Sequence, residues 1–144
     1  MTIVTRIIPI EGHESDILRL LGQLNPSLSR ELLAERLHAM KNMPYILIGA
    51  FINGVLVGLT GCWEIAKIFS GKQMEIDNFV IDEAERKKGI GAVLIKAVLA
   101  EGKRRNCSVF TLNAYVQNIA AHDFYKRQGF EVIGNHFILK SSDK

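Results

Sequence analysis

Cysteine and proline are scarce in this chain of 144 residues, which contains two cysteines and three prolines. Cys62 and Cys107 are far apart and match no metal-ligand spacing, so we expect two reduced thiols and no metal site. No apolar run is long enough to span a bilayer, and no signal peptide, internal repeat or low-complexity tract is evident. These absences exclude a disulfide scaffold, a zinc module and a membrane partner, and they predict a cytoplasmic protein.

The composition is that of an ordinary globular protein, with 48% hydrophobic and 23% charged residues. The length predicts a single domain over residues 1–144 with a substantial core. The net charge of +3 is compatible with an anionic ligand. Basic residues gather at 86–88, 103–105 and 126–127, where most of them fit solvated helix ends. These clusters lack the interleaved aromatic residues of nucleic-acid surfaces, so no nucleic-acid partner is predicted.

Hydrophobic periodicity divides the chain into strands and helices. Ser29 is a predicted helix cap, and Asn53-Gly54 between two apolar runs is the strongest hairpin signal. The predicted strands are 2–8, 45–52, 55–68, 74–81, 108–114, 130–133 and 136–140, and the predicted helices are 14–24, 30–41, 89–104 and 118–128. The first four strands should form an antiparallel meander, and the fifth, which returns after a helix, should lie parallel to the fourth. The fold class is therefore α/β (α+β), with a mixed central sheet of about six to seven strands.

The stretch from Met74 to Leu99 joins a strand to a helix through a polar loop that ends in Arg86-Lys87-Lys88-Gly89-Ile90-Gly91. The first N–H groups of a helix lack partners, and the helix dipole makes that end positive. Gly89 and Gly91 leave those amides bare, and the basic residues add charge beside them, so a phosphate or pyrophosphate fits here. A basic helix start that binds no ligand is the structural alternative.

Two known phosphate-loop patterns do not fit this loop. The P-loop requires Gly-Lys-Ser/Thr, but Gly91 is followed by Ala92 and Val93. The dinucleotide fingerprint requires a third glycine where Leu94 stands. The pattern that remains, Arg-x-x-Gly-x-Gly, resembles the pyrophosphate loop of the GNAT superfamily of acetyl-CoA-dependent N-acetyltransferases. The preceding Phe79-Val80-Ile81-Asp82 resembles the end of the fourth strand of that family.

A second stretch, from Asn118 to Phe130, resembles the other signature of this family. It has an Asn, an Ala three residues later, a Tyr at position 125 and a closing Gly-Phe. Asn118 and Tyr125 are seven residues apart, two helical turns along one face, so both can reach one ligand. A plain helix cap and a packing aromatic are the alternatives for these two residues. The close resemblance covers residues 75–130, and the first half of the chain matches the GNAT fold in element order alone, β-α-α-β-β-β-α-β-α-β-β.

The resemblance implies that acetyl-CoA is the cosubstrate and that no metal takes part. The pantetheine arm would pair with the strand at Phe79, Val80 and Ile81. The Val80 N–H would polarise the thioester carbonyl and hold the oxyanion. The residues implied in pyrophosphate binding are Arg86, Lys87, Lys88, Gly89, Ile90, Gly91 and Ala92. The final helix would contribute Asn118 as a donor to the pantetheine arm, Ala121 as a small residue beside the cofactor, and Tyr125.

Transfer of an acetyl group to an amine needs a base, because the amine is protonated at neutral pH. Glu75 stands where some family members carry a catalytic Glu, and Asp77 on the same strand face is the second candidate. Other members take the base from the next strand, but the matching residue is Asn113, which cannot act as a base. An exposed strand carboxylate without a catalytic role is an equal alternative for Glu75. Tyr125 is the implied acid for the departing thiolate, since a thiol has a pKa of about 8.5.

The acceptor is the part of the reaction that the sequence constrains least. A small amine, amino acid or polyamine is the first expectation, because the tail from Gly134 to Lys140 resembles that of members that acetylate small molecules. A protein or peptide N-terminus, or a lysine, is the second. A non-catalytic regulatory module that binds acetyl-CoA would need the loop but neither Glu75 nor Tyr125. Homodimers are common among relatives, so a homodimer is also an open expectation.

Overall fold

The structure is a computed structural model that describes residues 1–141. The chain divides into two compact units, the first from Met1 to Leu112 and the second from Asn113 onward. The single domain expected from the sequence stays a prediction. Within residues 1–141, no helix is long and apolar enough to cross a membrane.

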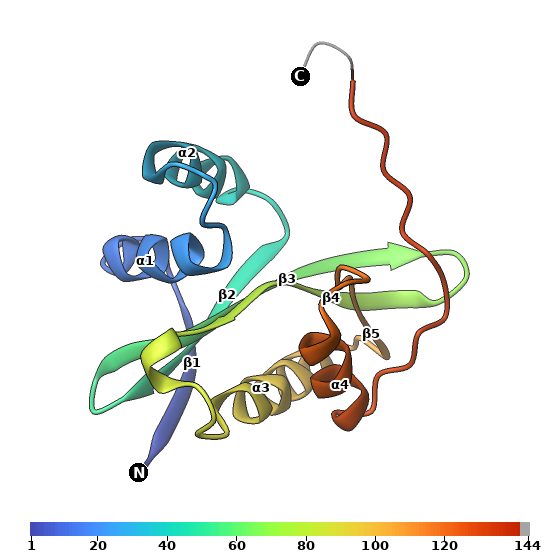
Figure 1. Cartoon of the computed structure of the whole chain (residues 1–144). Coiled ribbons are helices and arrows are strands. Elements are labelled where there is room, and N and C mark those ends of the chain that lie inside the picture. Colours follow the sequence, from blue (N-terminus) through green and yellow to red (C-terminus); the bar gives the residue numbers. More distant parts are fainter. Residues whose placement is uncertain (142–144) are drawn as a thin grey trace. The chain divides into compact units, whose positions relative to one another are not determined.

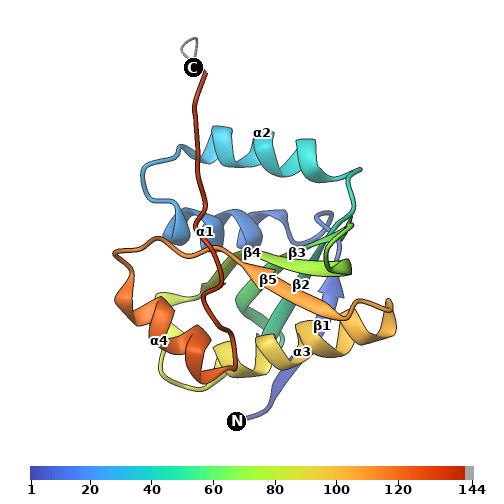
Figure 2. The same cartoon turned by 90° about the vertical axis from the view of Figure 1, so that its right-hand side faces the viewer.

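The first unit is a five-stranded sheet with helices on both faces (Figures 1 and 2). Its elements are β1 (Ile3–Ile8), α1 (Glu14–Leu24), α2 (Arg30–Met40), β2 (Tyr45–Ile52), β3 (Val55–Lys67), β4 (Gly71–Ile81), the 3-10 turn η1 (Glu83–Glu85), α3 (Ile90–Arg104) and β5 (Val109–Leu112). The strands lie in chain order, antiparallel from β1 to β4 and parallel between β4 and β5. The predicted meander and parallel return are confirmed.

The two faces of the sheet bury different sets of apolar side chains. The face under α1 and α2 has a core that includes Ile17, Leu20, Leu37, Leu59 and Val80. On the face under α3, the side chains of Ile81, Ile90 and Leu94 pack around Gly58. The period-3.6 pattern of each helix thus turns its apolar stripe toward the sheet, and the sheet holds β4 between two helical layers.

A β-bulge interrupts β4 shortly before its end. Gly61 pairs with Asp77 and Leu59 pairs with Val80, so one residue of β3 faces two residues of β4, Asn78 and Phe79. Asn78 has a φ of 60°, a left-handed conformation that asparagine adopts more readily than most residues. The glycines of β3 predict a bend or bulge in this region, and the extra residue lies on the partner strand.

The parallel pairing of β4 with β5 stops early. The last paired residues are Ile76 and Leu112, whereas β4 continues to Ile81. Val80 and Ile81 therefore pair with β3 and with no other strand of the first unit. Within the first unit, this leaves the last two residues of β4 with an open backbone edge beyond the end of β5.

The β3–β4 hairpin is longer than the sequence predicts, because β4 begins at Gly71 rather than at Met74. Lys72 and Gln73 pair with Ala66 and Ile65. Their side chains are polar, so the hydrophobic pattern of the sequence does not indicate a strand at these positions. Ile68 and Phe69 form the tip of this hairpin and are almost wholly exposed.

The second unit contains α4 (Ile119–Arg127). This helix begins after Asn118 and ends before Gly129, the two residues that the sequence predicts as its ends. The Asn118 side chain accepts a hydrogen bond from the Ala121 N–H at 3.2 Å, as an N-cap does. At the other end, the N–H groups of Gly129 and Phe130 donate to the carbonyls of Lys126 and Tyr125, and Gly129 has a φ of 100°. This is a Schellman motif, so the helix ends where the glycine predicts.

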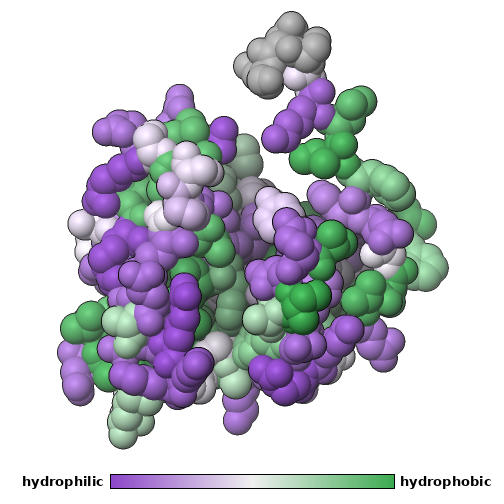
Figure 3. Space-filling model, in the orientation of Figure 1, coloured by the Kyte–Doolittle hydropathy of each residue, from purple (hydrophilic) through white to green (hydrophobic). Residues whose placement is uncertain are grey.

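The two predicted strands at 130–133 and 136–140 are wrong, because residues 130–141 contain no strand in the structure. The observed sheet therefore has five strands rather than six or seven. Apolar residues such as Val132, Ile133, Phe137 and Leu139 suggest strands, but their side chains are exposed (green along the segment after α4 in Figure 3). A strand needs a partner for its backbone groups, and the apolar pattern alone does not supply one.

Candidate functional site

The open edge of β4 presents backbone groups in a fixed order. The Asp82 N–H donates to the Val57 carbonyl of β3 at 2.8 Å, and Val80 lies opposite Leu59 in the same register. Because successive residues of a strand point their N–H and C=O groups to opposite sides, the Val80 N–H is directed toward β3 and the Ile81 N–H toward the open edge. The side chain of Val80 is 4% exposed, which agrees with its place in the core.

Arg86 lies on that same open edge. Its Nε donates a hydrogen bond to the carbonyl oxygen of Ile81 at 3.3 Å. The loop after β4 therefore folds back and places a guanidinium beside the Ile81 end of the strand. A positive charge next to outward-directed strand backbone is suited to an extended ligand that ends in phosphate groups.

Asp82 fixes the point at which the loop leaves the sheet. Its carboxylate accepts hydrogen bonds from Arg19 at 2.6 Å, from Gln23 at 3.3 Å and from the Ala84 N–H at 3.2 Å. Burial acts to raise the pKa of Asp82, but the Arg19 guanidinium and the two other donors hold it below its usual range. The loop is thus attached to α1 by a carboxylate that stays charged at neutral pH.

The start of α3 has the features that the sequence predicts for an anion site. Gly89 precedes the helix with a φ of 80°, and no acidic residue lies in the first turn. Ile90 is buried and anchors the turn from below. Lys88 pairs with Glu85 at 2.6 Å, and Lys87 is exposed with a φ of 67°. The first amides of α3 therefore have no carbonyl partner within the helix, and the basic residues Arg86, Lys87 and Lys88 come directly before Gly89.

Polar and aromatic side chains line the other candidate region, on the α1–α2 face of the sheet. Glu75 lies directly opposite Trp63 of β3, and Asp77 lies two residues further along β4 on the same face. The indole Nε1–H of Trp63 donates to Oδ2 of Asp77 at 3.0 Å. Both carboxylates are half-buried, and within residues 1–141 neither belongs to an ion pair.

Tyr45 supports this region from β2. Its ring packs on Trp63 with 4.6 Å between the ring centroids, and its hydroxyl oxygen accepts a hydrogen bond from Asn78 Nδ2 at 3.0 Å. Burial raises the pKa of the Tyr45 phenol, so the hydroxyl stays protonated. The bulge residue Asn78 and the aromatic pair thus hold one another in place.

Gly61 leaves the space that Tyr45 occupies, and we predict that Gly61→Ala destabilises the fold. A Cβ at this position would lie 1.7 Å from the Tyr45 hydroxyl oxygen, so the ring would have to move. We expect a loss on the order of 1–3 kcal/mol in the free energy of unfolding, measured by urea denaturation. Gly22→Ala in α1 is the control, because its Cβ would meet only Leu33 at 3.9 Å. Equal stability of both variants and the original chain would contradict this packing.

The second unit carries the remaining predicted residues on α4. Ala121 lies in the first turn beside its Asn118 cap, and Tyr125 lies one turn further along. The Tyr125 ring makes edge contacts with Phe124 and Phe130 at centroid distances of 5.2 and 5.9 Å. Burial raises the pKa of Tyr125 to about 12, so its phenol keeps its proton at neutral pH. The predicted site residues therefore belong to two groups, one on each unit.

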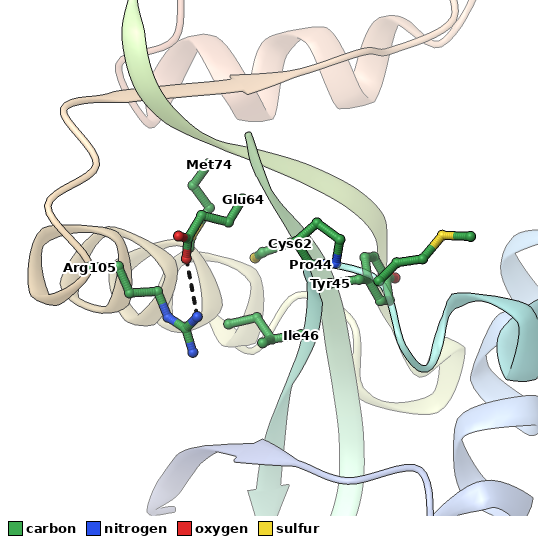
Figure 4. Close-up of a pocket in the computed structure, with 8 residues that line it drawn as sticks. Pro44, Tyr45, Ile46, Cys62, Glu64, Met74 and Arg105 are labelled. Atoms are coloured by element: carbon green, nitrogen blue, oxygen red, sulfur yellow. Dashed lines mark hydrogen bonds and ion pairs between the residues drawn. The ribbon is translucent and has the colours of Figure 1, made fainter. Parts of the chain in front are cut away.

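The sequence does not predict a cavity of about 310 Å³ on the α3 face of the first unit (Figure 4). The cavity lies near Arg105, at the C-terminal end of α3. For a helix of this length, that end is about 22 Å from Gly89 at the other end. The charged groups of the cavity are already paired, since Glu64 contacts both Lys72 and Arg105. Burial raises the pKa of the Cys62 thiol to about 12, so this cysteine is not a nucleophile. The cavity shares Tyr45 with the region described above but is lined by neither Glu75 nor Asp77.

Comparison with known proteins identifies the family. Residues 15–130 match the model of the acetyltransferase (GNAT) family. The chain belongs to this family. An uncharacterized N-acetyltransferase of Methanocaldococcus jannaschii is 36% identical over 83 residues, which are 56% of this chain and 36% of that protein. The chain thus spans about a third of the length of this curated relative.

Solved structures share the fold over nearly the whole chain. A GNAT family acetyltransferase of Staphylococcus aureus has a TM-score of 0.79 at 26% identity, over 98% of this chain and 100% of the other. A ribosomal-protein-alanine N-acetyltransferase of Brucella melitensis has a TM-score of 0.83 at 17% identity, over 98% and 100%. An aminoglycoside N-acetyltransferase in complex with CoA also has a TM-score of 0.83 at 17% identity, over 98% and 95%. At 17% identity the likeness shows the GNAT fold alone.

Proposed function

We propose that this protein is an acetyl-CoA-dependent N-acetyltransferase that transfers the acetyl group directly to a primary amine. The observation that carries the proposal is the open edge of β4 continuing into a basic loop and the bare amides of α3. Membership of the GNAT family supports it, as does the CoA-bound state of one structural neighbour. The two free cysteines are both buried, which fits the reducing cytoplasm as the place of action.

We assign the parts of coenzyme A to successive residues of the chain. We propose that the loop and the first turn of α3 hold the diphosphate, with Arg86, Lys87, Lys88, Gly89, Ile90, Gly91 and Ala92 as its binding residues. Bare helix amides and a guanidinium are the donors that phosphate oxygens prefer. The edge at Phe79, Val80 and Ile81 would pair with the pantetheine arm. Asn118, Ala121 and Tyr125 of α4 stay predicted contributors to the same cofactor.

The strand register changes the proposed donor for the oxyanion. The sequence favours the Val80 N–H, but that group is directed toward β3. We therefore assign the role to the Ile81 N–H, which is directed to the open edge, next to the carbonyl that Arg86 contacts. A preorganised backbone donor of this kind is worth on the order of 3 kcal/mol in the transition state.

The reaction needs one proton removed and one proton supplied. Acetyl-CoA supplies an activated acetyl group, whose carbonyl carbon is attacked by the lone pair of the amine nitrogen. The new C–N bond forms as the C–S bond breaks, and the electron pair leaves with the sulfur. We propose Glu75 as the base that takes the proton of the ammonium, directly or through a water, with Asp77 as the second candidate. Tyr125 is the proposed donor to the departing sulfur.

Tyr125→Phe should lower the turnover number on the order of tenfold, with little change in acetyl-CoA affinity. Because burial raises the pKa of Tyr125 to about 12, the phenol stays protonated over the working range. The ratio of wild-type to variant turnover should therefore be constant from about pH 6 to about pH 10. Initial rates of thioester consumption at saturating amine measure this ratio. Unchanged turnover would remove Tyr125 as the donor.

For the acceptor we favour a small molecule that carries a protonated amine. The support is the pair of half-buried carboxylates, Glu75 and Asp77, because a cationic acceptor would supply their missing counter-charge. A protein N-terminus or lysine is the second candidate, since one structural neighbour is named for a ribosomal protein. A second neighbour is named for an aminoglycoside, which is a small polyamine.

A panel of acceptors tests the proposal. It should contain polyamines, amino acids, aminoglycosides and N-terminal or lysine peptides, each supplied with acetyl-CoA while free thiol is followed. We expect thiol release that depends on a small amine, together with an acetylated product of matching mass. Binding of acetyl-CoA without thiol release from any amine would favour a regulatory module. Release with peptides alone would favour a protein acetyltransferase.

A further inference from the structure

We propose that Trp63 is a positioning residue for the acceptor, which it orients by holding the carboxylate of Asp77. In this assignment Asp77 anchors the positive charge of the amine, and Glu75 is left to take the proton. The inference rests on the proposed function and divides the two carboxylates into separate roles. It concerns a residue of β3 that lies outside both signatures of the family.

The contact between Trp63 and Asp77 fixes one of the two carboxylate oxygens. The indole N–H donates to Oδ2 at 3.0 Å, which leaves Oδ1 available to a ligand. Trp63 and Asp77 are diagonal neighbours across the β3–β4 ladder, because Trp63 pairs with Glu75 and Gly61 pairs with Asp77. A short carboxylate held in one orientation suits the binding of an ammonium at a defined place.

Trp63 is itself held by a closed set of contacts. Its ring lies against Tyr45, the Tyr45 hydroxyl oxygen accepts from Asn78, and Asn78 follows Asp77 in the chain. These contacts therefore connect the Trp63 indole to the Tyr45 phenol, the phenol to Asn78 in the bulge, and the bulge to Asp77. A functional group is positioned accurately when its supporting side chains are locked in this way. The bulge therefore serves the acceptor side of the reaction as well as the open edge.

Glu75 has the opposite character. Its carboxylate makes no hydrogen bond or ion pair with residues 1–141, and its side chain is one methylene longer than that of Asp77. It lies roughly 7 Å from Asp77 along the strand, the span of two residues. A carboxylate at that distance, with no contact to restrain it, can approach the ammonium nitrogen of an acceptor that is paired with Asp77. This geometry assigns the anchor to Asp77 and the proton transfer to Glu75.

Trp63→Phe tests the assignment, since it keeps an aromatic ring against Tyr45 and removes the N–H donor together with part of the indole's volume. We expect KM for the amine to rise about tenfold, with kcat within about twofold and KM for acetyl-CoA unchanged. Asp77→Asn should raise the amine KM by more. The double variant should be no worse than Asp77→Asn alone, because Trp63 acts through that carboxylate.

The matched control combines Trp63→Phe with Glu75→Gln. Here the two effects should multiply, because Trp63 and Glu75 have separate roles. Independent effects of Trp63→Phe and Asp77→Asn would overturn the proposal, and so would a loss confined to kcat. If the wild-type protein acetylates amines and Trp63→Phe leaves the amine KM unaltered, the proposed function stands and this inference is wrong. Wild-type protein that releases no thiol with any amine would reject both.

Fluorescence supplies a second readout that does not need turnover. The sequence contains one tryptophan, so the indole emission comes from Trp63 alone. Titrating the accepted amine into Glu75→Gln protein should shift this emission, with a midpoint near the wild-type KM. The same titration in protein that also carries Asp77→Asn should need about tenfold more amine. An emission that the amine leaves unchanged would show that the acceptor does not bind beside Trp63.

Discussion

Gly91→Glu is expected to abolish the binding of coenzyme A, with the dissociation constant rising by a factor of 100 or more, on the order of 3 kcal/mol. Gly91 lies in the first turn of α3, where the bare amides and the positive end of the dipole face the proposed diphosphate. A glutamate there would fill the position of the phosphates and repel their charge. Isothermal titration with coenzyme A measures the change directly.

The control for this variant adds the same charge elsewhere on the same helix. Ala100 is exposed on α3, about 14 Å further along its axis, so Ala100→Glu should bind coenzyme A within about twofold of wild type. Circular dichroism would show that both variants fold. Tight binding by Gly91→Glu would mean that the diphosphate lies elsewhere.

Glu75→Gln is expected to lower the turnover of the amine by about 100-fold to 10,000-fold, while acetyl-CoA affinity stays the same. Glutamine keeps the shape of the side chain but cannot take the proton of the ammonium. Turnover should recover in part as the pH rises, because a larger share of the amine then carries a free lone pair. Steady-state kinetics across pH, with thiol release as the signal, check both statements.

Glu35→Gln is the matched control, since Glu35 is an exposed carboxylate on α2. It should leave kcat and both KM values unchanged. If Glu75→Gln turned over normally and Asp77→Asn did not, Asp77 would be the base. The separate roles proposed for the two carboxylates would then also be wrong.

Features that depend on neighbours in the chain were predictable from the sequence. The hairpin at Asn53-Gly54, the cap at Ser29 and the start of α3 at Gly89 each depend on a few adjacent residues, and all three are present. The end of α4 at Gly129 has the same origin. Local backbone preferences decide such features before any tertiary contact forms.

Features that depend on a distant partner were not predictable in the same way. Asn78 inside a strand is a signal for left-handed backbone, but the bulge also needs the register of β3. That register decides which amides face the open edge, so the sequence pointed to Val80 and the structure supports Ile81 as the donor. The contact of Trp63 with Asp77 joins residues fourteen apart and has no sequence pattern.

The tail has the apolar residues of a strand but lacks a partner strand. Residues 130–141 have the apolar content of strands, yet Leu139 is 97% exposed and no strand forms there. The composition of a segment indicates how much apolar surface it can bury, whereas a strand forms only when another strand lies beside it.

A crystal structure of the protein with coenzyme A would locate the cofactor. We expect diphosphate oxygens within hydrogen-bond distance of the amides from Gly89 to Ala92, and a pantetheine arm along β4 near Ile81. A coenzyme A molecule bound at any other surface, for example in the cavity beside Arg105, would contradict this expectation.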